Sequence, residues 1–114
     1  MAEEVFSIRD EGKVAVVELL TELDRLSVLS IKTQLRGLAT KRGKNRFVIN
    51  FDKIDHINST IVGALVGIQH LVRERGGDLV LSNVKPNIRR TFDLIGASKI
   101  LRIYDTEEEA LKNL

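Results

Sequence analysis

Residues 47–63, FVINFDKIDHINSTIVG, contain a strand pattern, a short loop and the start of a helix pattern. Residues 47–51 are apolar and rich in β-forming side chains, which is typical of a central strand buried on both faces. After a short polar loop, apolar residues at i, i+4, i+7 and i+11 predict an amphipathic helix from Asn58–Ser59 to Arg75. This stripe comprises Ile61, Leu65, Ile68 and Val72. A buried strand followed by a helix indicates an α/β sheet with parallel strands.

The residues before this stretch add a hairpin and a first helix. The β-forming runs 5–8 and 14–19 flank a turn at 10–13 and predict a hairpin. Helical spacing then begins at Ser27 and continues to about residue 43. Its repeating apolar residues are Val28, Leu29, Ile31, Leu35 and Leu38.

The residues after it continue the alternation. Residues 78–82 predict a strand, and Pro86 and Gly96 bound a third helix, since proline favours the first helical position and glycine the end. Residues 100–104 predict a last strand, and Thr106 with three following glutamates predicts a helix opened by a capping box. The predicted order is β-β-α-β-α-β-α-β-α, an α/β fold with a mixed sheet whose inner strands are parallel.

The composition indicates one small domain without thiol or membrane chemistry. A length of 114 residues fits a single domain over residues 1–114. There is no cysteine, which excludes disulfides and thiolate metal sites. No apolar run approaches the ~20 residues of a membrane span, and the first residues, MAEE, carry acids where a signal peptide carries bases. We therefore expect a cytoplasmic domain that does not insert into membranes.

Catalytic motifs are missing from the sequence. It holds no Walker loop, no G-x-S-x-G elbow and no G-x-G-x-x-G turn. The two histidines, His56 and His70, would lie roughly 20 Å apart along the predicted helix axis, too far to share one metal ion. No nucleophile with a base and an orienting group can be assembled. We therefore expect a protein that is not an enzyme and that has neither a cofactor nor a metal site.

Two further patterns have simple structural interpretations. Gly63 and Gly67 form a G-x-x-x-G spacing, which we interpret as close packing of the predicted helix against a neighbour. Between Arg25 and Phe51 there are seven basic residues and no acidic one. Because only 4% of residues are aromatic and no recognition helix stands out, direct DNA binding is not expected. A solvated helix face is the favoured explanation, and steering of an acidic protein partner is the second.

The predicted helix start at Asn58–Ser59 places a hydroxyl beside free backbone N–H groups. As a plain N-cap, the Ser59 oxygen would accept a hydrogen bond from one of them and contribute about 1 kcal/mol. A phosphorylated Ser59 would carry about −1.5 to −2 charges where the helix dipole partly compensates them. The residues by themselves favour the N-cap.

The whole chain resembles a STAS domain, and more closely the bacterial anti-sigma-factor antagonists. The central match is INSTIVG at 57–63, where that family has D-S-S/A-G-L/V-G/A. Further matches are the helix end RERGG with LVLS at 79–82, VKPNIRRTFDLIG at 84–96, KILRIYDTEEEA at 99–110, and TELD at 21–24, where the family often has G-x-L-D. The chain departs from the family pattern at three positions: Asn58 replaces Asp, Thr60 the second small residue, and Ile61 the Gly.

The resemblance implies a regulatory switch. In that family an anti-sigma factor with kinase activity phosphorylates the serine that corresponds to Ser59, and a phosphatase reverses the reaction. The unmodified protein binds the anti-sigma factor and frees the sigma factor. Thr60 is the weaker candidate hydroxyl. Some STAS domains with altered motifs instead serve in stress-signalling scaffolds or as cytoplasmic subunits of lipid ABC transporters, and this alternative stays open.

The docking surface that we expect is the turn before the second helix together with the exposed face of that helix. Val62 and Val66 are placed there at the edge of the buried stripe, and the small Gly63 and Gly67 allow a close approach. The predicted partner-binding residues are Asn58, Ser59, Thr60, Val62, Gly63 and Val66.

Overall fold

One mixed β-sheet organises residues 4–114, the part of the chain that this computed structural model describes. Its five strands are β1 (Phe6–Glu11), β2 (Val14–Leu19), β3 (Arg46–Asn50), β4 (Asp78–Ser82) and β5 (Ile103–Tyr104). The helices are α1 (Arg25–Lys41), α2 (Ser59–Arg73), α3 (Pro86–Ile95) and α4 (Glu107–Lys112), with a short 3-10 turn, η1 (Ala97–Lys99), after α3. The predicted order of strands and helices is confirmed.

The strands lie in the sheet in the order in which they follow along the chain, β1-β2-β3-β4-β5. The β1–β2 hairpin is antiparallel, and each later strand is parallel to the one before it. In register, Val17 lies beside Ile49, and Ile49 beside Leu81. The carboxyl ends of the parallel strands therefore meet at one edge of the sheet, where the loop into α2 begins.

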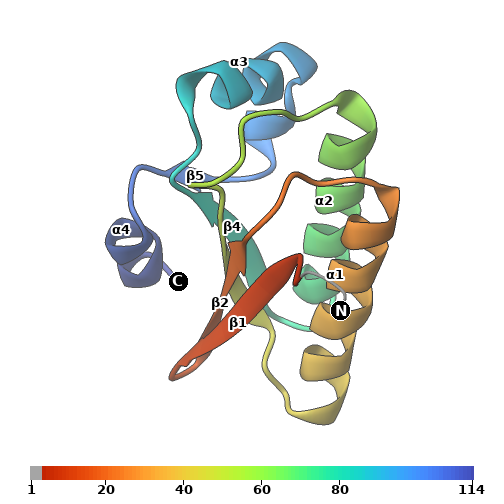
Figure 1. Cartoon of the computed structure of the whole chain (residues 1–114). Coiled ribbons are helices and arrows are strands. Elements are labelled where there is room, and N and C mark those ends of the chain that lie inside the picture. Colours follow the sequence, from red (N-terminus) through yellow and green to blue (C-terminus); the bar gives the residue numbers. More distant parts are fainter. Residues whose placement is uncertain (1–3) are drawn as a thin grey trace.

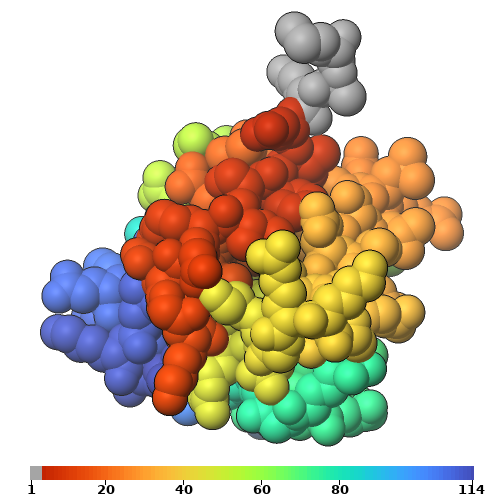
Figure 2. Space-filling view, turned by 90° about the horizontal axis from the view of Figure 1, so that it is seen from below, coloured from red at the N-terminus to blue at the C-terminus, as the bar shows by residue number. Residues whose placement is uncertain are grey.

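Helices cover both faces of the sheet (Figure 1). Alternate strand residues point to opposite faces, so each face has its own apolar cluster. Val17, Ile49 and Leu81 lie in the larger cluster, under α1, α2 and α3, and Val48 and Val80 lie in the smaller one, under α4. In the view from below, the β1–β2 hairpin lies between α4 and α1 (Figure 2). No helix within residues 4–114 is long and apolar enough to cross a membrane.

The first helix begins two residues earlier than the sequence pattern predicted. Asp24 is its N-cap: Asp24 Oδ1 accepts from the Ser27 N–H at 2.8 Å, and Ser27 Oγ accepts from the Asp24 N–H at 2.8 Å. These reciprocal bonds form a capping box. Leu29, which fitted the predicted apolar stripe, is 58% exposed and lies outside the core.

The C-terminal segment differs in two details. The last strand was predicted over residues 100–104, but only Ile103–Tyr104 pair with β4, because Ala97–Lys99 form the 3-10 turn η1. At the start of α4, Thr106 Oγ1 accepts from the Glu109 N–H at 3.1 Å. The structure records no return bond from the Glu109 side chain within residues 4–114, so only half of the predicted capping box forms.

Candidate functional site

The candidate site is the turn between β3 and α2. Asn58 is the N-cap of α2: its side-chain Oδ1 accepts from the Ile61 N–H at 2.9 Å, and its backbone carbonyl accepts from the Val62 N–H at 3.1 Å. The prediction that Ser59 caps the helix is therefore wrong. Asn58 is the better placed of two adjacent capping residues, and Ser59 becomes the first residue of the helix. Its hydroxyl is released from any structural role in the cap.

Two hydroxyls are presented to solvent at this helix start. Ser59 and Thr60 are both exposed, and within residues 4–114 neither side chain has a hydrogen-bond partner. Their backbone N–H groups also have no acceptor in the described part of the chain. The positive end of the α2 dipole thus faces solvent beside both hydroxyls. Such a site stabilises an added phosphate group.

Polar contacts from two other segments fix the turn. The Glu22 carboxylate, from the loop before α1, accepts from the Asp55 N–H at 2.9 Å and from the His56 N–H at 3.0 Å. From the start of α3, Lys85 Nζ lies 2.5 Å from Asp55 Oδ1, and Asn87 Nδ2 donates to the Asp55 carbonyl at 3.0 Å. The hydrogen bond from Lys85, helped by its charge, lowers the pKa of Asp55 below its ordinary value.

Buried apolar residues anchor the same turn on the side that faces the core. Phe51 and Ile54 are fully buried, and the Ile54 N–H donates to the Phe51 carbonyl at 2.9 Å. The Phe51 ring meets Phe92 of α3 edge to face, with centroids 6.1 Å apart. The turn that carries Ser59 is therefore fixed by Phe51 and Ile54 on its buried side and by Glu22 and Lys85 on its exposed side. Sequence reasoning had not identified Glu22 or Lys85, because each lies about 30 residues from the turn that it holds.

The structure exposes most of the predicted docking residues but buries one. Asn58, Ser59, Thr60 and Gly63 are exposed and Val66 is half-buried, whereas Val62 is only 1% exposed. The partner-binding role predicted for Val62 is therefore wrong. Val62 is buried because its face of α2 packs against another segment. Gln69 lies on the same face, two turns further along, and its Nε2 donates to the Ile100 carbonyl at 2.7 Å. This row of α2 packs toward the α3–η1 segment, and the row through Gly63 and Val66 remains as the open side.

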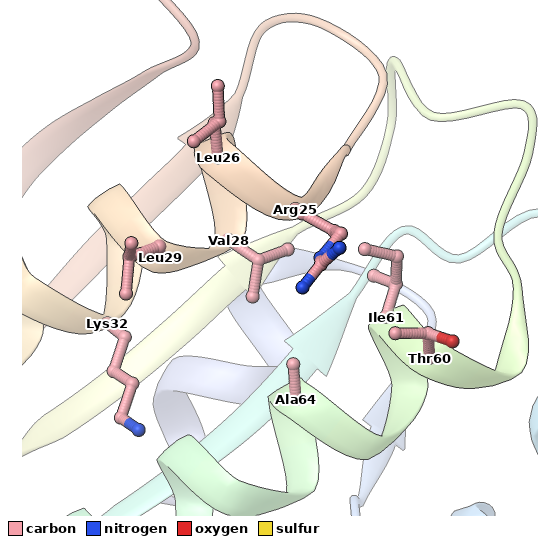
Figure 3. Close-up of a pocket in the computed structure, with 8 residues that line it drawn as sticks. All are labelled: Arg25, Leu26, Val28, Leu29, Lys32, Thr60, Ile61 and Ala64. Carbon is pink, nitrogen blue, oxygen red and sulfur yellow. The ribbon is translucent and has the colours of Figure 1, made fainter.

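The two glycines of the G-x-x-x-G spacing also lie on this open side. A Cβ placed on Gly63 or on Gly67 would meet no atom within 4 Å, so the close helix packing predicted for them is wrong. They line a groove between α1 and α2, which we call the α1–α2 groove. It consists of two hollows of about 530 and 450 Å³ that share Lys32. Figure 3 shows the hollow nearer to Thr60.

The sheet order, the helices on both faces and the serine turn at the start of α2 together define the class of protein. They are the architecture of a STAS domain. Residues 6–110 match the family described as STAS domain, and the chain belongs to that family.

Related proteins agree with this assignment. The chain is 29% identical over 101 residues to the anti-sigma F factor antagonist of Paenibacillus polymyxa, covering 89% of this chain and 86% of that protein. Among solved structures, the protein TM1081 of Thermotoga maritima superposes with a TM-score of 0.85 at 22% identity, covering 95% of this chain and 92% of that one. The unphosphorylated anti-sigma factor antagonist SpoIIAA has a TM-score of 0.80 at 24% identity, covering 95% and 94%. The Bacillus SpoIIAA has also been solved in a phosphorylated form, with a TM-score of 0.73.

Proposed function

We propose that this protein is an anti-sigma factor antagonist and that phosphorylation of Ser59 switches it off. In its unmodified state it binds an anti-sigma factor, so that the sigma factor is freed. It acts by binding a protein, not by catalysing a reaction. The observation that carries the proposal is the Ser59 hydroxyl, which is exposed, free of hydrogen bonds within residues 4–114, and located at the start of α2. The name of the Paenibacillus relative and the phosphorylated form of SpoIIAA support it.

The geometry supports a simple mechanism for the switch. An anti-sigma factor with kinase activity transfers the γ-phosphoryl group of ATP to Ser59 Oγ; ADP leaves, and the hydroxyl proton passes to a base of the kinase. The phosphate gains the N–H groups of Ser59 and Thr60, which have no acceptor within residues 4–114, so α2 stays folded. A partner that packed against the neutral turn now meets about −1.5 to −2 charges and must desolvate them. A phosphatase restores the binding state.

The contact surface follows from the exposed residues of this region. It comprises Asn58, Ser59, Thr60, Gly63 and Val66, without the buried Val62. Because Glu22 and Lys85 hold the turn in one conformation, the partner pays little to order it on binding.

Incubation with the cognate anti-sigma kinase and ATP, followed by phosphosite mapping with mass spectrometry, tests the proposal. We expect one phosphate on Ser59, none in Ser59→Ala, and normal modification in the neighbouring control Thr60→Ala. Phosphate only on another residue, or none from a kinase that modifies a control substrate, would contradict the switch.

Asn58 favours a second candidate function, in which the domain is never phosphorylated. Asn58 supplies the helix cap through a neutral amide, without the carboxylate that stands there in the phosphorylated antagonists that the chain resembles. A STAS subunit of a stress-signalling scaffold or of a lipid ABC transporter, never phosphorylated, is the alternative function. Absence of phosphate on Ser59 in the same experiment, together with stable binding to such an assembly, would establish it.

A further inference from the structure

The α1–α2 groove has a basic and apolar wall that the phosphorylation switch does not use. Arg25, Leu29, Lys32 and Arg36 recur on α1 at i, i+4, i+7 and i+11, so they share one helix face. All four are exposed, and Leu29 has 58% of its surface open to solvent although it is a large apolar residue. A three-turn row of cations interrupted by an exposed leucine therefore borders the groove.

The facing wall, on α2, has three small residues at its centre, between larger side chains such as Ile61 and His70. Gly63 and Gly67 leave open space where side chains would stand, and Ala64 lies beside them. Figure 3 shows Arg25 and Val28 extending from α1 toward the first turns of α2, with the Ala64 methyl group pointing back at them. The groove is thus open over the glycines, because neither of them fills it with a side chain.

The charges of the groove are unbalanced. Within residues 4–114, Arg25, Lys32 and Arg36 have no carboxylate within ion-pair distance, whereas seven other basic side chains do. Glu74, at the far end of the second hollow, is the one acidic residue among those that line the two hollows. A ligand of this groove is therefore expected to be acidic along the side that faces α1.

We propose that the α1–α2 groove docks an acidic amphipathic helix of a protein partner. The span from Arg25 to Arg36 is about 16 Å, which matches three turns of a helix. Apolar side chains of the partner fill the space over Gly63 and Gly67, and its acidic side chains pair with Arg25, Lys32 and Arg36. The groove is concave, so a rod-like helix fits it better than a flat anionic membrane does. This proposal does not depend on phosphorylation of Ser59.

The test uses a fluorescein-labelled peptide of about 14 residues, with leucines at i, i+3, i+4 and i+7 and glutamates elsewhere, titrated into the full chain and followed by anisotropy. We expect saturable binding, with amide shift changes at Leu29, Gly63 and Gly67 in ¹⁵N spectra. The charge-reversal pair K32E/R36E is expected to weaken binding about ten-fold or more. The matched control R89E/R90E changes the net charge equally, on exposed residues of α3, and is expected to leave binding unchanged.

A second pair of variants tests the shape of the groove. Gly67→Leu fills the hollow at a position where the new side chain has room, so the fold is retained while peptide binding is lost. Gly37→Leu adds the same side chain on α1, at a glycine where a Cβ likewise meets nothing within 4 Å and which does not line the groove, and binding is expected to persist. No binding of the acidic peptide, an equal loss in both charge-reversal pairs, or binding only to phosphatidylglycerol vesicles would overturn the proposal. Any of these results leaves the Ser59 switch untouched.

Discussion

Asn58 and Ser59 are adjacent polar residues with different roles. Asn58 caps α2 through its side chain and its carbonyl, while the Ser59 hydroxyl has no partner within residues 4–114. We predict that Asn58→Ala lowers the free energy of unfolding by about 1 kcal/mol, and that Ser59→Ala changes it by less than about 0.5 kcal/mol. Urea denaturation of both variants measures this difference. The opposite ranking would show that Ser59 is the cap.

Glu22 acts on the same turn from a distance. Its carboxylate accepts from two backbone N–H groups, at Asp55 and His56, so its removal frees both. We predict that Glu22→Ala raises the hydrogen-exchange rates of these two amides about ten-fold or more, without unfolding the domain. Glu11→Ala, another exposed glutamate outside the turn, serves as the control and is expected to change neither amide. Equal exchange in both variants would mean that Lys85 and the buried anchors hold the turn by themselves.

At the scale of the elements, Glu107 ties α4 to the sheet. Its carboxylate lies 2.6 Å from an Arg9 nitrogen of β1 and accepts from Asn50 Nδ2 of β3 at 2.5 Å. Burial raises the pKa of Glu107, but the hydrogen bonds from Arg9 and Asn50 outweigh it, so this pKa lies below its ordinary value. A lowered pKa in the folded state means that the charged carboxylate stabilises the fold above the unfolded-state pKa of about 4.3, and that this stabilisation is lost as the pH falls further.

The prediction for Glu107 follows from the direction of its pKa shift. At pH 7, Glu107→Gln is expected to lower the free energy of unfolding by about 1–2 kcal/mol. The difference between the two proteins is expected to shrink as the pH is lowered from about 5 to 3. Urea denaturation at a series of pH values measures it. A difference that stays constant over this range would show that the ionised carboxylate contributes nothing to the attachment of α4.

A substitution at Gly63 tests whether this side of α2 is open to a partner. Because a Cβ at this position meets no neighbour within 4 Å, Gly63→Leu is expected to keep or raise stability, by up to about 1 kcal/mol from the better helix propensity. The same variant is expected to weaken binding of the anti-sigma factor, since the leucine occupies the surface beside Ser59. Thermal melting and a binding titration measure the two effects. An unfolded variant would place Gly63 in the core instead.

The order of elements was predictable because it depends on local patterns. Continuous apolar runs marked the central strands, and Pro86 and Gly96 marked both ends of α3 as the structure has them. Helix starts were less predictable where two adjacent residues can both cap the helix, as Asn58 and Ser59 can. The burial of Val62 and the openness of Gly63 depend on which rows of α2 meet η1 and α1, and no local pattern carries that information.

At the scale of the whole molecule, contacts from several segments fix one exposed turn, and its surroundings stay open. The parallel strands end beside the turn, and the β2–α1 loop and the start of α3 brace it. The first N–H groups of α2 have no acceptor in the described part of the chain. A braced turn whose exposed Ser59 hydroxyl has no partner within residues 4–114 suits a protein whose binding is controlled by one covalent change. In the proposed switch, a phosphate on Ser59 would change this surface while Asn58 still caps α2.

The most direct test of this account is the affinity of the cognate anti-sigma factor for the unmodified and the Ser59-phosphorylated protein, measured by isothermal titration calorimetry. We predict that phosphorylation weakens binding by about 5- to 150-fold, the range of a coupling of about 1–3 kcal/mol. Ser59→Asp is expected to bind like the phosphorylated form and Ser59→Ala like the unmodified one. Equal affinity of the phosphorylated and unmodified proteins would contradict the account.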